Sequence, residues 1–207
     1  MHKKNKKMSL KSASLLILII LLIDQFSKIF IKTNFILGEE VEVFSWFKIL
    51  FIENEGMAWG TEIPGQHGKL ILTSFRILAV IGIGYWLYDT STKYCSNFLM
   101  VAISLIFAGA AGNIIDSVFY GQVFSDSHHQ LADLFTDKPY ETWFHGKVVD
   151  MLYFPIWSGN LPEWLPFWGG KPFTFFNAIF NFADMAISTG VGILIVFNKR
   201  AFAKRFY

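Results

Sequence analysis

Residues 13–32 read ASLLILIILLIDQFSKIFIK, an apolar run as long as the roughly 20 residues with which a helix crosses a bilayer. Five lysines precede the run, and no small-x-small cleavage site follows it. We therefore expect a retained first transmembrane helix rather than a removed signal peptide. The run contains Asp24 and Lys28, and a charge at the centre of a span costs about 2.5–3.5 kcal/mol. Such residues indicate a partner inside the protein or a function.

Three further runs have the same length and character: residues 70–88, 98–116 and 175–197. The composition agrees, because 53% of the 207 residues are hydrophobic and only 16% are charged. Soluble domains carry about 25% charged residues. The sequence therefore predicts an all-α integral membrane protein with four transmembrane helices. We expect residues 1–207 to form a single membrane-embedded domain.

The lysines and arginines predict which side of the membrane each segment faces. Both tails and the short link at 89–97 carry basic residues, whereas most acidic residues lie in the two longer loops. Cytoplasmic segments carry an excess of lysine and arginine. We therefore expect both termini in the cytoplasm, and the loops at about 33–69 and 117–174 on the extracytoplasmic side.

The two outer loops differ in character. Residues 40–60 are rich in β-branched and aromatic residues with partial alternation, which predicts a small sheet against the outer membrane face. Residues 161–173 read LPEWLPFWGGKPF and combine proline, glycine and tryptophan. Because tryptophan is enriched at the membrane–water interface, we expect this second segment to lie there.

Polar residues inside the first and third spans fall on defined faces. Asp24 and Lys28 share one face of the first helix, which allows either a structural ion pair or a role near a site. The third span ends in small residues at 108–112, followed by Asn113 and Asp116 on one face. Small residues let neighbouring helices approach closely, so we expect a tight helix contact there.

The fourth span carries a polar stripe at helical spacing. If its helix starts at 175, Asp184 lies about 12 Å below the outer end, at 1.5 Å per residue. Three other carboxyls, those of Asp24, Asp116 and Asp150, are expected at a similar depth. The stripe consists of Asn177, Asn181, Asp184 and Ser188.

Such a concentration of carboxyl groups has a chemical meaning. Two carboxyls in a low-dielectric site do not both ionise readily, so one pKa rises and the pair shares a proton. The ionised member can take a proton from water while the protonated member polarises a carbonyl. Asp184 is the best-placed member of such a pair, and Asp24, Asp116 and Asp150 remain rival partners.

Other catalytic schemes find less support in the sequence. Cys95 falls on the predicted cytoplasmic side, and no G-x-S-x-G elbow occurs. His128 and His129 are adjacent, which suits one metal ion poorly, and there is no H-E-x-x-H motif. A metal–carboxylate site stays open but lacks an imidazole ligand.

Five short motifs occur along the chain: Asp24-Gln25-x-Ser27-Lys28, Asn54-x-Gly56-x-Ala58-Trp59, Gly112-Asn113-Ile114-Ile115-Asp116, Val148-Val149-Asp150-Met151, and Phe180-Asn181-x-Ala183-Asp184. In this order they resemble the motifs of the lipoprotein signal peptidases (signal peptidase II), a family of bacterial intramembrane aspartyl proteases. Each motif alone is weak, whereas five in order on the predicted topology are specific. The resemblance covers nearly the whole chain.

The resemblance implies a site and an activity. It places the two catalytic aspartates at Asp150 and Asp184, and so selects Asp150 among the rivals. It implies a prolipoprotein substrate whose lipobox cysteine already carries diacylglycerol, cleaved on the N-terminal side of that cysteine. The supporting or substrate-binding residues that it implies are Asp24, Lys28, Asn54, Gly56, Asn113, Asp116 and Asn181.

The resemblance also implies the surroundings of the enzyme. It implies a monomer in the bacterial cytoplasmic (inner) membrane, in contact with membrane lipid, with its site facing the extracytoplasmic side. It implies no cofactor, no metal and no nucleic-acid partner. Inhibition by the cyclic peptide globomycin and an outer β-cradle over residues 35–60 are further expectations.

The sequence departs from the family in two places. The family usually has arginine after the equivalent of Asp116, whereas this chain has Ser117. The loss of that positive charge should raise nearby carboxyl pKa values or weaken the order of the site, unless Lys28, Lys147 or Arg76 compensates. In addition, about 30 residues separate the motifs of Asp116 and Asp150, where the family has only a few. This insertion at 117–147 is either an outer-loop elaboration or a lid or partner-docking element.

Two other functions stay open on the sequence alone. A small ion-coupled membrane transporter would also carry carboxylates inside its spans, although four helices without a detectable repeat argue against it. A catalytically inactive relative that binds lipoproteins is the second alternative, and Ser117 and the insertion motivate it.

Overall fold

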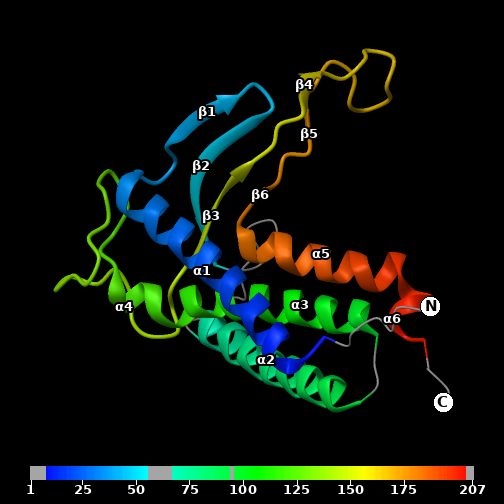
Figure 1. Cartoon of the computed structure of the whole chain (residues 1–207). Helices are drawn as coiled ribbons and strands as arrows, with labels where there is room; N and C mark the ends of the chain where they lie inside the picture. The colour runs from blue at the N-terminus through cyan, green and yellow to red at the C-terminus, as the bar shows by residue number, and fades with distance from the viewer. Residues whose placement is uncertain (1–7, 56–66, 94–95, 204–207) are drawn as a thin grey trace.

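Three long helices form most of the helical part of the protein (Figure 1). The computed structural model describes residues 8–55, 67–93 and 96–203. Helices α1 (Leu10–Asn34) and α2 (Gly68–Thr92) have 25 residues each. The third spanning helix runs over Asn97–Val123. All three are long and apolar enough to cross a bilayer, so long apolar helices are present in the three regions where spanning helices were predicted.

The third helix continues beyond its predicted end at residue 116. Helix α3 (Asn97–Ile115) passes into a π-helical turn, η2 (Asp116–Tyr120), and then into α4 (Gly121–Val123). The sequence becomes polar near Asp116, but Asp116 and Ser117 are buried in the protein. A helix can continue through polar residues that are buried and have partners. The change from apolar to polar sequence near Asp116 was therefore a poor marker of where the third helix ends.

The fourth predicted span, 175–197, is wrong at its start. Helix α5 covers Phe182–Val196, only 15 residues, and a short helix α6 (Asn198–Ala201) follows. At 1.5 Å per residue α5 is about 22 Å long, less than the roughly 30 Å of a bilayer core. The structure thus has three to four apolar helices, and the four-span topology with both termini cytoplasmic stays a prediction.

The predicted polar stripe is also wrong, because its first two members precede the helix. Asn181 is the N-cap of α5, and Asp184 is the third residue of the helix rather than a residue deep within it. The side chain of Asn181 accepts from the backbone N–H of Asp184, and the Asp184 carboxylate accepts from the backbone N–H of Asn181. This capping box fixes the helix start. Asn177 lies before it and accepts a 2.9 Å hydrogen bond from the Tyr153 hydroxyl.

A four-stranded antiparallel sheet lies at the end of the bundle where α1 ends and α5 begins (Figure 1). Its order is β1 (Glu40–Phe44), β2 (Phe47–Asn54), β3 (Val148–Tyr153) and β6 (Ile179–Phe180). The sheet predicted in the first outer loop is therefore present. Its pairing places Asn54 opposite Val148 and Ile52 opposite Asp150, so the segment that follows α1 meets the strand that carries Asp150.

The central helix is α3, which packs against α1, α2 and α5. Its small residues permit the close approach that the sequence predicts. A Cβ atom at Gly109 would lie 2.2 Å from the carbonyl oxygen of Ala183 in α5. Helix α5 therefore begins directly against the part of α3 that carries Asn113.

The insertion at 117–147 is an integral part of the fold. Its first residues extend α3, and the rest folds back on that extension, with Phe144 N–H donating to Val118 C=O and Glu141 N–H to Gly121 C=O. It also binds the segment that follows α1, since Leu37 N–H donates to the carbonyl of Ser127. Phe124 is fully buried in a core with residues of β2 and β3. Of the two alternatives, these contacts favour a fixed elaboration of the outer loop over a lid.

Candidate active site

Asp150 lies in the middle of β3, with only 3% of its surface exposed. Its Oδ1 accepts a 2.7 Å hydrogen bond from Nδ2 of Asn181, and its Oδ2 accepts one from the side-chain amide of Asn54. Burial raises the pKa of the Asp150 carboxyl to about 7, and the negative charge of Asp184 acts in the same direction. Lys28 and the two amide donors oppose this shift. Asp150 is therefore a carboxyl that gains or loses its proton near neutral pH.

Asp184 occupies the first turn of α5. Its Oδ1 accepts a 2.8 Å hydrogen bond from Nδ2 of Asn113, and its Oδ2 accepts the capping bond from Asn181 N–H at 3.4 Å. The positive end of the helix dipole favours a negative charge at this position. A fixed, hydrogen-bonded carboxylate therefore stands beside Asp150.

Asn181 connects the two aspartates. Its Nδ2 donates to Asp150, while its Oδ1 accepts from the backbone N–H of Asp184 at 2.9 Å. Asn181 is fully buried, and the same Nδ2 also lies 3.2 Å from Oδ1 of Asn113. One amide side chain thus orients the strand carboxyl and starts the helix that carries the second carboxyl.

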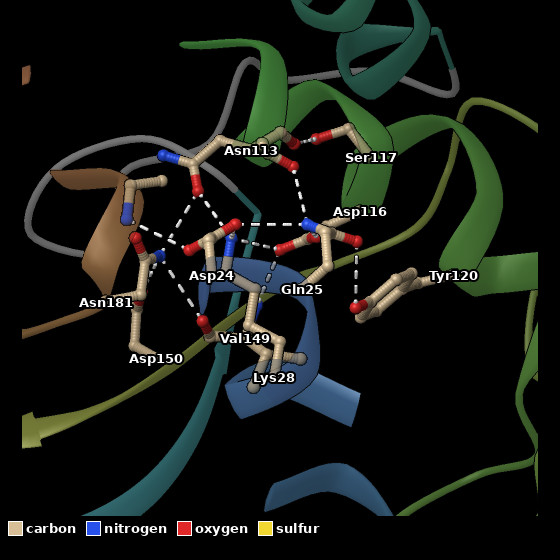
Figure 2. Close-up of polar contacts among 12 residues, drawn as sticks. Asp24, Gln25, Lys28, Asn113, Asp116, Ser117, Tyr120, Val149, Asp150 and Asn181 are labelled. Carbon is tan, nitrogen blue, oxygen red and sulfur yellow. Dashed lines mark hydrogen bonds and ion pairs between the residues drawn. The ribbon is translucent and has the colours of Figure 1, made fainter. Parts of the chain in front are cut away.

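Lys28 joins the other two carboxylates predicted at this site (Figure 2). Its Nζ lies 2.9 Å from Asp24 and 2.8 Å from Asp116, and all three side chains are essentially inaccessible to solvent. Nζ also donates to Oδ1 of Asn113 at 2.9 Å. Since Asn113 in turn donates to Asp184, the ammonium group of Lys28 is linked through one amide to the candidate pair. The structure contains the predicted Asp24–Lys28 ion pair and places it beside the site as well.

Asp24 and Asp116 also bind the backbone of the two elements that carry the candidate pair. Asp24 Oδ1 accepts from Ala183 N–H at 2.9 Å, in the first turn of α5. Asp116 Oδ2 accepts from Val149 N–H at 3.4 Å, next to Asp150 in β3. Both carboxylates therefore bind the backbone of the elements that carry Asp150 and Asp184. This position suits a supporting role better than membership of the carboxyl pair.

Two residues that sequence reasoning had not assigned to the site complete this cluster. Gln25 Nε2 donates to Asp24 and Asp116, each at 3.0 Å, and its Oε1 accepts from the Tyr120 hydroxyl at 3.2 Å (Figure 2). Gln25 stands in the first motif, which was the available signal. Tyr120 carries no such signal, because its contact depends on the extension of α3 past its predicted end.

A second buried lysine holds the insertion against the sheet. Lys32 is fully buried, and its Nζ binds Glu53 of β2 and, at 2.8 Å, the hydroxyl of Ser127. The rings of Phe124 and Tyr140 lie 5.4 and 4.6 Å from the same nitrogen. Lys32 lies four residues after Lys28 and hence on the same helix face, a spacing that could have predicted its burial. Glu53 directly precedes Asn54, so this ion pair fixes the strand that supplies a donor to Asp150.

Ser117 does not act on the carboxyl pair. Its side chain is buried and donates to the carbonyl of Asn113 in its own helix at 3.0 Å. Of the basic residues predicted to compensate, Lys28 lies in the cluster and Arg76 acts electrostatically on Asp184. Gly56, the remaining predicted site residue, lies outside the described residues, as do Ala58 and Trp59 of the same motif.

The geometry fits acid–base chemistry between two carboxyls. One member is buried with its pKa raised toward neutrality, and the other sits at a helix N-terminus. Within residues 8–55, 67–93 and 96–203, no group of three or more histidine, cysteine or acidic side chains is arranged to hold a metal ion. The residues gathered here can orient water and polarise a carbonyl group.

Known proteins resemble this chain over nearly its whole length. The family described as signal peptidase (SPase) II matches residues 16–199. The lipoprotein signal peptidase of Porphyromonas gingivalis is 49% identical over 192 residues, which cover 92% of this chain and 84% of the relative. That of Amoebophilus asiaticus is 37% identical over 188 residues, covering 89% of this chain and 75% of the relative. A solved structure described as a bacterial membrane enzyme has a TM-score of 0.63 at 25% identity, over 99% of both chains.

Proposed function

This chain belongs to the signal peptidase II family, and from that premise we propose that Asp150 and Asp184 are the catalytic pair of an aspartyl lipoprotein signal peptidase. The protein is a membrane-embedded peptidase of lipoprotein precursors. Its family favours this activity over a transporter or an inactive binding protein. The observation that supports the aspartyl mechanism best is the double contact of Asn181, which holds one carboxyl through its side chain and caps the helix of the other.

The proposed reaction is the hydrolysis of one peptide bond. The ionised member of the pair, Asp184, takes a proton from water as the water oxygen attacks the scissile carbonyl carbon. The protonated member, Asp150, donates a hydrogen bond to the carbonyl oxygen, on which negative charge develops. As the tetrahedral intermediate collapses, the C–N bond breaks and the leaving nitrogen receives a proton from the pair. The products are a free carboxylate and a free amine, and no covalent enzyme intermediate forms.

The surrounding residues would set the charge balance of this reaction. The single negative charge of the shared-proton pair is offset by Lys28, acting through Asn113, and by Arg76. Lys28 is also shared with Asp24 and Asp116, so its one positive charge serves these two carboxyl groups as well as the pair. We infer that burial keeps Asp150 protonated while Asp184 is ionised, and that Asn54, Asn113 and Asn181 hold the two carboxyls in place.

The proposal includes the setting of the site. We infer that the substrate is a diacylglyceryl-modified prolipoprotein, cut N-terminal to the lipidated cysteine, and that globomycin-type peptides inhibit the cut. We also infer a monomer in the cytoplasmic membrane of a bacterium, in contact with lipid, with four spans, cytoplasmic termini and an extracytoplasmic site. Gly56 stays a proposed substrate-binding residue of this setting.

A cleavage assay on a diacylated lipobox peptide in lipid nanodiscs tests the pair. Asp150→Asn and Asp184→Asn should each abolish cleavage while the protein remains folded, and the matched control Asp137→Asn should cleave normally. Asp137 is an exposed carboxylate of the insertion. Full activity in either pair variant would overturn the assignment. Normal binding of uncut peptide by the unaltered protein, without turnover, would instead identify an inactive relative.

A further inference from the structure

A second, two-stranded sheet lies in the sequence between the strand that carries Asp150 and the helix that carries Asp184. Strands β4 (Trp157–Asn160) and β5 (Pro172–Phe175) pair antiparallel, from Trp157 opposite Phe175 to Asn160 opposite Pro172. The loop between them is ordered by its own backbone, with Leu161 N–H donating to Lys171 C=O at 2.9 Å and Gly169 N–H to Leu165 C=O at 3.0 Å. We call residues 156–176 the aromatic hairpin.

The aromatic hairpin has few neighbours within the protein. Its two strands contact each other and have no extensive packing with another described helix or strand. In Figure 1 it reaches past the four-stranded sheet to the side of the helix bundle, across the axis of α5 rather than along it. If the helices span a bilayer, a segment that leaves their outer end in this direction runs parallel to the membrane surface.

Large aromatic side chains cover the aromatic hairpin and lie open to its surroundings. Phe167 is 92% exposed, Trp164 79% and Trp168 63%. Further exposed rings are those of Trp157, Phe173, Phe175 and Phe176. Charged residues are scarce, since residues 156–176 contain only Glu163 and Lys171.

Such a structure is poorly suited to water. An isolated two-stranded hairpin is at best marginally stable there, and exposed apolar patches mark a surface that binds something. A protein partner bound through charge would require more than one acidic and one basic residue. Tryptophan and phenylalanine beside proline and glycine, at the end of apolar helices, are instead typical of the membrane–water interface, where an indole keeps its N–H in the polar layer.

We propose that the aromatic hairpin is a membrane anchor that lies in the bilayer leaflet nearest the four-stranded sheet and inserts Trp164, Phe167 and Trp168 among the lipids. Helix α5, which follows the hairpin in the chain, also exposes apolar side chains, those of Met185, Val191 and Ile195. The hairpin is the covalent link between β3 and α5. Anchoring it therefore sets the depth at which Asp150 and Asp184 stand relative to lipid, independently of which of them does the chemistry.

Spin labels on the unliganded protein test this proposal. In a Cys95→Ser background, single cysteines replace Phe167, the lipid-facing control Phe75 of α2, and the control Asp137 of the insertion. Phe75 is 68% exposed on an apolar spanning helix. Each protein is labelled with a nitroxide in lipid nanodiscs, and its collision rates with oxygen and with a water-soluble nickel chelate are measured. The labels at 167 and 75 should collide more often with oxygen, which concentrates in the bilayer. The label at 137 should collide more often with the nickel chelate, which stays in water.

Two results would overturn the anchor. A label at 167 that meets nickel as readily as the label at 137 would place the hairpin in water. A label that becomes shielded only after a diacylated lipobox peptide is added would make the substrate its partner instead of the bilayer. Trp164→Cys, labelled in the same way, is the second variant, and it should agree with Phe167→Cys if the whole loop is embedded.

Discussion

Asn181 donates a hydrogen bond from Nδ2 to Oδ1 of Asp150 at 2.7 Å, and this contact joins the strand of one aspartate to the helix start of the other. The relationship is unusual for a helix cap, whose side chain normally serves its own helix alone. Here the oxygen of the amide caps α5 and its nitrogen orients Asp150. The helix cap and the contact with Asp150 therefore depend on different atoms of one side chain.

Substitutions of Asn181 should separate these two roles. Asn181→Ser keeps an N-cap oxygen but loses the donor to Asp150, whereas Asn181→Ala loses both. We expect Asn181→Ala to be about 1 kcal/mol less stable than Asn181→Ser, because only the alanine variant lacks the cap oxygen. Both should lose activity, because the protonated Asp150 loses the donor that orients it, and such a hydrogen bond contributes about 0.5–1.5 kcal/mol, or roughly two- to tenfold in rate. Thermal unfolding and kcat in nanodiscs measure the two effects. Full activity in Asn181→Ser would show that the amide donor has no part in the reaction.

The rate should depend on pH through Asp150. Its pKa lies near 7, and the proposed mechanism needs it protonated, so cleavage should be fast below about pH 7 and decline as the pH rises through that value. Asn54→Leu removes a donor that favours the charged form, and should move the decline to higher pH. The measurement is a pH profile of kcat/KM on the diacylated peptide. Because the two carboxyls are coupled, the fall in rate reports the titration of the pair rather than of Asp150 alone. A flat profile across this range would contradict the prediction.

The same pKa has a consequence for stability. A carboxyl whose pKa is higher in the folded than in the unfolded protein holds its proton better when folded, so stability falls as the pH rises between the two values. For Asp150 this window runs from the ordinary range near 4 to about 7. Asp150→Asn does not titrate and should therefore unfold at a higher temperature than the unaltered protein at about pH 8, but not at pH 4. A scan of unfolding temperature against pH checks this, and equal curves for both proteins would contradict the raised pKa.

The sequence predicted the positions of three long apolar helices well, because apolar length is visible directly in the residues. It failed at the fourth, since FFNAIF at 175–180 is as apolar as a span but folds as strand and turn. What decides the helix start is the capping box between Asn181 and Asp184, a local signal inside an apolar run. Hydropathy does not detect such a signal.

The sequence predicted which residues belong to the candidate site better than it predicted how they contact one another. Intramembrane charges marked Asp24, Lys28 and Asp184, and the family resemblance added Asp150. Nothing in the spacing showed that β2 and β3 pair, and so nothing placed Asn54 beside Asp150. The contact of Tyr120 was hidden for the same reason, because it arises from tertiary packing between segments 95 residues apart.

Gly112 should tolerate no side chain. A Cβ atom there would lie 2.6 Å from Oδ2 of Asp24, the oxygen that binds Lys28. Gly112→Ala should therefore displace the charged cluster, with a stability loss of about 1–3 kcal/mol and a fall in cleavage rate. Gly82→Ala in α2 is the matched control, since no atom lies within 4 Å of its Cβ position. That control should be neutral or slightly stabilising, as alanine favours a helix over glycine. Equal effects of the two variants on thermal unfolding would refute the close contact.

Lys32 should contribute strongly to the stability of the fold, although it does not contact Asp150 or Asp184. Lys32→Met leaves Glu53 buried without its charged partner, and breaking a buried pair in this way costs about 3–5 kcal/mol. Lys48→Met is the control, because the Lys48–Glu40 pair is partly exposed and such pairs contribute about 1 kcal/mol or less. If the buried charge is the cause, the double variant Lys32→Met/Glu53→Gln should regain most of the loss. Thermal unfolding in nanodiscs measures all three. A double variant as unstable as Lys32→Met would show that the lysine acts through its ring contacts with Phe124 and Tyr140, and not through Glu53.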